Sequence, residues 1–138
     1  MRSERARART RTRPGRAREQ LNEAQHPALG RLRQVCAALP EVREVTTYGH
    51  PTFQTGRKTF AVLEHYKGLL MIAVKTTSVR QRELASTERY QVTPYAGRYG
   101  WVSALVDGQT NWREVDSLVV ESYRLVAPRR AVALLDSR

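Results

Sequence analysis

Residues 45–74 carry the most regular pattern of apolar and polar positions in the chain, and it predicts three or four β-strands joined by tight turns. Residues 52–55 alternate in polarity, as a half-buried strand does. Gly56 and Arg57 follow as a two-residue turn, because glycine at the first turn position tolerates a positive φ. The pattern therefore predicts a β-hairpin centred on this turn.

Two further strands complete the predicted meander. Residues 58–63 form the first of them, and residues 65–68 supply the turn that follows. Residues 69–74 are an unbroken apolar hexapeptide, which is typical of a strand covered on both faces. We therefore expect an antiparallel sheet in which this last strand is central.

Ahead of the meander, leucines and other apolar residues recur at spacings of three and four, which predicts a helix. Proline is well tolerated in the first turn of a helix, so the helix begins near Pro27, with His26 just before it. Pro40 closes it. Its leucine stripe is expected to pack on the sheet.

Behind the meander, residues 78–86 predict a short helix with Ser78 as its N-cap. Residues 87–98 are predicted to be irregular, since they contain the breaker Pro94. Residues 100–106 predict one more strand, which completes the sheet.

A second long helix is predicted to begin after Asn111, a good N-cap, with Glu114 near the positive end of the helix dipole. Pro128 ends it, and residues 129–135 form a last segment whose apolar side chains can dock on the core. This order of elements predicts an α+β fold, in which helices pack on one face of an antiparallel sheet.

The length of 138 residues and the 41% of hydrophobic residues suit one folded domain, predicted to span residues 19–138. The longest apolar run has six residues, far below the roughly 18 that a membrane span requires. The cationic start lacks an apolar signal region, so we expect a cytoplasmic protein. Cys36 is the only cysteine, which excludes an internal disulfide, and its apolar helical setting predicts a core position.

The net charge of +11 is unevenly distributed. Residues 1–18 hold eight arginines and one acid, Glu4, a net charge of +7, which leaves +4 for the remaining chain. They contain no large apolar side chain after Met1, so we expect a disordered, arginine-rich arm. The arm could contact phosphates. Two alternatives stay open: translation from an upstream start codon, or a transit peptide.

Both predicted turn tips of the meander carry cations. Arg57 and Lys58 lie on one tip and Lys67 lies on the other. Mobile cationic side chains on exposed turns suit contact with phosphates. The competing interpretation is a pair of solvated turns, since a few cations occur on any protein surface.

Four segments, in this order along the chain, resemble the MmcQ/YjbR family. They are LRQVCAALP at residues 32–40, YGHPTF at residues 48–53, PYAGRYGWV at residues 94–102 and SYRLVAP at residues 122–128. With the segments between them, the resemblance covers roughly residues 29–135.

This resemblance implies a CyaY-like, that is frataxin-like, fold and a DNA-binding role in which two β-turns act as a double wing. The wings would correspond to the turn at Gly56 and Arg57 and the turn at residues 65–68, which turn chemistry also predicts. We therefore expect weak or non-specific binding of duplex DNA through Arg57, Lys58 and Lys67, helped by the arm.

A pocket for an anionic small molecule is the main alternative. His50 is a titratable group in a predicted constrained turn, and Arg98 lies between Tyr95 and Trp101. These four residues could form a ligand site. The structural alternative is a histidine that hydrogen-bonds across its turn and a tryptophan that belongs to the core.

Catalysis and metal binding find little support. No Ser, Cys or Thr lies in a recognisable nucleophile motif, so we expect no enzyme. His26, His50 and His65 are far apart in the sequence, with no pair at metal-ligand spacing, so we expect neither a metal nor a cofactor. A protein-interaction module that uses the apolar surface of a helix remains a third possibility, and the sequence does not set the oligomeric state.

Overall fold

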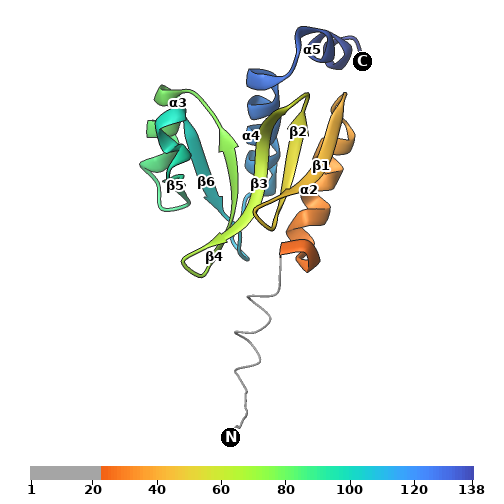
Figure 1. Ribbon diagram of the computed structural model, residues 1–138. Helices are drawn as coiled ribbons and strands as arrows, with labels where there is room; N and C mark the ends of the chain where they lie inside the picture. Colours follow the sequence, from red (N-terminus) through yellow and green to blue (C-terminus); the bar gives the residue numbers. More distant parts are fainter. Residues whose placement is uncertain (1–22) are drawn as a thin grey trace, which may run out of the picture.

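An antiparallel sheet of six strands, in the order β1-β2-β3-β4-β6-β5, forms the centre of the structure (Figure 1). The computed structural model describes residues 23–138. The strands are β1 (Val42–Thr47), β2 (His50–Thr55), β3 (Lys58–Tyr66), β4 (Leu69–Lys75), β5 (Tyr90–Val92) and β6 (Trp101–Leu105). The helices are α2 (Pro27–Ala37), α3 (Ser78–Ala85), α4 (Trp112–Val126) and α5 (Arg129–Asp136), with short 3-10 turns η2 (Glu23–Gln25) and η3 (Ala96–Tyr99).

The predicted α+β class is confirmed. Side chains of α2, α3, α4 and α5 share one buried cluster with a single face of the sheet, so the helices cover that face and leave the other face without one. None of the described helices is both long and apolar enough to cross a membrane. The predicted arm at residues 1–18 lies outside the described residues, as do the first four residues of the predicted domain.

The meander has four strands, and its turns are tighter than the sequence predicted. Gly56 has a φ of +63°, as the predicted hairpin requires. The next turn consists of Lys67 and Gly68 alone, because β3 continues to Tyr66, which pairs with Leu69 of β4. A first hairpin, which the sequence analysis did not resolve, joins β1 to β2 through Tyr48 and Gly49.

This first hairpin corrects the position of His50. The prediction placed this residue in a constrained turn, but it is the first residue of β2 and pairs with Thr47. The residues with positive φ are instead Tyr48 and Gly49, and the favoured two-residue hairpin turn requires a positive φ at both of its central residues.

Strand β4 is central, as predicted. It pairs with β3 on one side and β6 on the other, and Leu70 to Val74 are all buried. The segment at residues 87–98, predicted to be irregular, contains both the edge strand β5 and η3. A three-residue strand is too short for its period to be recognised, which explains the difference.

Helix ends follow capping chemistry closely. Asn111 caps α4 as predicted, with its side chain accepting a hydrogen bond from the N–H of Glu114. Helix α3 is capped one residue earlier than predicted, by Thr77. Helix α2 ends at Ala37 rather than at Pro40, because the chain already turns toward β1, and Glu41 reaches a φ of +58°.

Helix α4 is anchored to the sheet by two polar side chains. The Ser122 hydroxyl donates to the carbonyl oxygen of Phe60 in β3 at 2.7 Å and accepts from the N–H of Lys75 in β4 at 2.9 Å. Tyr123 packs its ring edge-on against Phe60, with 5.5 Å between centroids, and donates its hydroxyl to the carbonyl oxygen of Pro40 at 2.7 Å. All of these contacts are made within a single turn of the helix.

Removal of the Ser122 hydroxyl should therefore destabilise the fold. We expect Ser122→Ala to lower the free energy of unfolding by about 2–4 kcal/mol, because two buried backbone groups lose their partner. Urea denaturation monitored by circular dichroism measures the change. Ser86→Ala removes an exposed hydroxyl that bonds only Glu83, and should change stability by less than about 0.5 kcal/mol. Equal effects of the two substitutions would contradict this role of Ser122.

Candidate functional site

The two predicted wings lie at opposite ends of strand β3. Arg57 and Lys58 stand where β3 begins, and Lys67 follows the residue where it ends. The nine residues of β3 span roughly 26 Å at about 3.3 Å per residue step. The two tips therefore do not form one continuous surface.

The end of the sheet near Arg57 gathers more cations than the sequence predicted. Strand β4 runs antiparallel to β3, so its last residue, Lys75, lies at this end. Arg98 lies in η3, directly before β6 starts at the same end. Arg129 opens α5, whose next residue, Arg130, pairs with Glu41 just before β1, again at this end. We call the set Arg57, Lys58, Lys75, Arg98 and Arg129 the cationic end.

Within the described part of the chain, none of these five cations forms an ion pair. Lys75 donates to the carbonyl oxygen of Tyr99 at 3.1 Å, and the Arg98 guanidinium lies 4.9 Å from the centre of the Tyr99 ring. Arg57, Lys58 and Arg129 are exposed. Their charges are therefore uncompensated.

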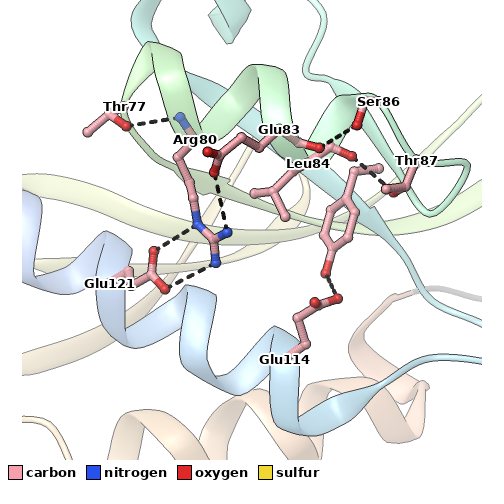
Figure 2. Close-up of polar contacts among 9 residues, drawn as sticks. Thr77, Arg80, Glu83, Leu84, Ser86, Thr87, Glu114 and Glu121 are labelled. Atoms are coloured by element: carbon pink, nitrogen blue, oxygen red, sulfur yellow. Dashed lines mark hydrogen bonds and ion pairs between the residues drawn. The ribbon is translucent and has the colours of Figure 1, made fainter.

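The acidic groups near this end are, by contrast, all paired with other cations. Figure 2 shows the guanidinium of Arg80 on α3 between Glu83 and Glu121, at 3.8 and 3.4 Å. The remaining pairs are Glu41 with Arg130, Asp136 with Arg124 and Glu44 with Arg33. These acids therefore do not neutralise the five cations of the cationic end.

At the opposite end of β3, a carboxylate bridges two strands. The paired register of β2 and β3 reaches only to Thr52 and Val62, and His50 and His65 lie beyond it. Glu23 joins the two strands there: its carboxylate accepts from the backbone N–H of His65 at 3.3 Å and lies 2.9 Å from the Nδ1 atom of that ring. Its other oxygen lies 3.1 Å from Nδ1 of His50.

These contacts hold Glu23 in its ionised form. Burial alone would raise the pKa of this carboxyl, but the hydrogen bonds with His65 and His50 outweigh it and lower the pKa below the usual value. Glu23 is only 9% exposed, so its charge would be costly without the two histidines.

The third histidine lies nearby. His26 caps α2, with its Nδ1 accepting from the N–H of Ala28 at 3.0 Å, which requires that nitrogen to be unprotonated. Burial and the charge of His65 lower the pKa of His26. The fold therefore brings together histidines that are far apart in the sequence, although no group of three or more His, Cys, Asp or Glu within residues 23–138 is placed to hold a metal ion.

A hollow of about 430 Å³ opens on the helix-free face of the sheet. It is lined by Tyr48, Thr59, Val62, Glu64, Ala73, Thr93, Pro94, Tyr95, Ala96 and Trp101. Of the four residues predicted to form a ligand pocket, it brings together Tyr95 and Trp101. His50 and Arg98 are not among its lining residues: the first is held by Glu23, and the second stacks on Tyr99.

The sequence analysis missed Glu23, Tyr48 and Glu64. Tyr48 could have been noticed, because it precedes a glycine and together they form a hairpin turn. Glu64 shares a strand face with Val62, as the period of two predicts. Glu23 offered no local signal, since His50 and His65 lie 27 and 42 residues further along the chain.

Cys36 is buried, as the apolar pattern around it predicted. Burial, with the charge of Glu44 in addition, raises the pKa of its thiol to about 12. A thiol with so high a pKa is almost entirely protonated at neutral pH and is a poor nucleophile.

Comparison with known proteins gives one family and one fold. Residues 37–125, well over half of the chain, match the model of the YjbR family. The crystal structure of the Deinococcus radiodurans protein DR2400, which carries the domain DUF419, superposes with a TM-score of 0.66 at 21% sequence identity, over 78% of this chain and 87% of that chain. No curated protein matches.

The Glu23 bridge predicts how stability depends on pH. Because its folded-state pKa is lowered, Glu23 stabilises the fold above the unfolded carboxyl pKa, and this contribution is lost as the pH falls through the folded-state value. We expect Glu23→Gln to lower the free energy of unfolding at pH 7 by about 1–3 kcal/mol.

Urea denaturation at pH 7 and at about pH 3, below the ordinary carboxyl range, checks this expectation. The difference between Glu23→Gln and the wild type should shrink at the lower pH, whereas the exposed control Glu88→Gln should match the wild type closely at both. A difference that does not depend on pH would show that the charge of Glu23 is unimportant.

Proposed function

This chain belongs to the YjbR family, and from that premise we propose that it binds duplex DNA weakly, with little sequence preference, through the cationic end of its sheet. The observation that carries the proposal is the local charge balance. Five cations there have no acidic partner among the described residues, while the neighbouring acids are all paired. Uncompensated cations release counterions from the phosphate backbone when they bind it.

The geometry favours one wing over two. The two turns lie beyond opposite ends of β3, which is roughly 26 Å long, whereas the major groove of DNA is only about 12 Å wide, so both tips cannot enter one groove side by side. Arg57 and Lys58 lie with the other members of the cationic end, while Lys67 lies apart, with its ammonium group 5.4 Å from the centre of the Tyr66 ring. We therefore propose that the Gly56–Arg57 turn makes the main contact with DNA and that Lys67 contributes little.

The contacts expected of this surface are with phosphates. Arginine and lysine at a turn and at strand ends position a protein on the backbone, while sequence preference requires donors and acceptors placed at base edges. The cationic end offers no such ordered set. The proposal includes no catalytic step, because the only thiol, on Cys36, is buried and protonated.

The first prediction for DNA binding concerns the folded domain without the arginine-rich arm. A chain that begins at residue 19 should still bind a labelled duplex, with log K falling against log salt at a slope of about −4.5 if five phosphates are contacted. The full chain should bind more tightly and with a steeper slope. Fluorescence anisotropy over a range of salt measures both. Loss of all binding in the shorter chain would overturn the proposal, since the arm alone would then bind DNA.

The second prediction locates the surface. In the chain that begins at residue 19, Arg57→Glu combined with Arg98→Glu should weaken DNA binding at least about tenfold and flatten the salt slope by about 2. Lys67→Glu, which changes the charge by the same amount per residue at the other end of β3, should weaken it less than about threefold. Circular dichroism confirms that each variant is folded. A larger effect of Lys67→Glu would restore the second wing.

A further inference from the structure

The hollow on the helix-free face contains an acid without a partner. Glu64 lies on β3 and is half-buried, yet it forms no hydrogen bond or ion pair with any other described residue. The other acids that are at least partly buried differ: Glu23 has two histidines, Asp116 is paired with Arg31 and Glu121 with Arg80. Burial, with the charge of Glu23 in addition, raises the pKa of Glu64, although the charge of His50 opposes the shift.

Three aromatic residues line the hollow together with this carboxylate. Trp101 and Tyr95 line the hollow from the side of β6 and η3, and Tyr48 lines it from the β1–β2 turn. Tyr48 and Tyr95 are each 95% exposed, and both have a positive φ, of +51° and +65°. For Tyr48 this conformation belongs to the hairpin turn, whereas Tyr95 adopts it outside any hairpin, directly before η3, at a conformational cost of the kind found at ligand sites. The hollow thus combines one carboxylate with three rings.

Charge decides which ligand suits the hollow. Its lining contains no lysine, arginine or histidine, so Glu64 carries the only charge among the lining residues and would repel an anion. A neutral apolar ligand would cover the carboxylate without pairing it, which is unfavourable. A metal ion such as calcium requires six to eight oxygen ligands, and Glu64 is the only carboxylate present. An organic cation satisfies the carboxylate and is also attracted to the faces of the rings.

We propose that the hollow binds a small organic cation, an alkylated ammonium or a guanidinium, with its charge against Glu64 and its apolar part between Tyr95 and Trp101. The volume of about 430 Å³ lies within the range of small-molecule sites. This site shares no residue with the cationic end but borders it, because Thr59 follows Lys58 and Trp101 pairs with Lys75. Its charge preference is opposite to that of the anion pocket expected from the sequence.

Nuclear magnetic resonance of the full chain tests the proposal. The chain has two tryptophans, so two indole N–H signals report separately on the hollow and on α4. Choline and butylguanidinium, added at about pH 8, where carboxyl groups are ionised, should shift the Trp101 signal and leave the Trp112 signal in place. The neutral isostere of choline, 3,3-dimethylbutan-1-ol, should bind at least about tenfold more weakly, since it lacks the charge.

Two variants assign the effect to Glu64. Glu64→Gln retains the size of the side chain and removes its charge, and should weaken choline binding at least about tenfold. Glu88→Gln removes an exposed charge outside the hollow and should leave binding unchanged. The dispersion of the amide signals shows whether each variant is folded.

Three results would overturn the proposal. The first is no shift of Trp101 with either cation up to roughly 30 mM, which would nearly saturate a site with a Kd of about 1 mM. The second is equal binding of choline and its neutral isostere, which would indicate an apolar hollow only. The third is full affinity in a folded Glu64→Gln variant.

Discussion

One turn of helix α4 holds the layers of this protein together. Ser122 bonds the backbone of β3 and β4 at once, and Tyr123 reaches the loop before β1. The carbonyl oxygen of Phe60 and the N–H of Lys75 lie near the end of the sheet where the Gly56–Arg57 turn and η3 lie. The same contacts that seat the helix therefore fix the spacing of the strands that carry the uncompensated cations. The proposed contact with a phosphate backbone would benefit from so firm a support.

Sequence reasoning succeeded where the cause of a structure is local. Asn111 caps α4 because its side chain can reach a backbone N–H three residues away, and Gly56 forms a turn because of its own φ. It failed where the cause is distant or short. Strand β5 has three residues and exists because β6 offers it a partner. Likewise, Glu23 depends on strands that only the tertiary fold brings beside it.

The candidate sites show the same division. The turn at Arg57 could be predicted from its chemistry, but the charge around it could not, because that depends on which acids are already paired. The pocket prediction contained two residues of the hollow, Tyr95 and Trp101, and expected an anionic ligand, whereas we propose a cation. The difference rests on a single residue: Glu64 on β3 lines the hollow, whereas Arg98 does not.

The two outermost strands of the sheet, β1 and β5, decide how it meets other chains. An exposed strand edge is a template for further strands, and proteins protect it with short length, charge or proline. Strand β5 has three residues and is followed within two by Pro94, while β1 places Arg43 and Glu44 in the middle of its exposed run. Growth of the sheet by edge-to-edge pairing between molecules is thus disfavoured on both sides, which protects a protein with so apolar a central strand from amyloid-like aggregation.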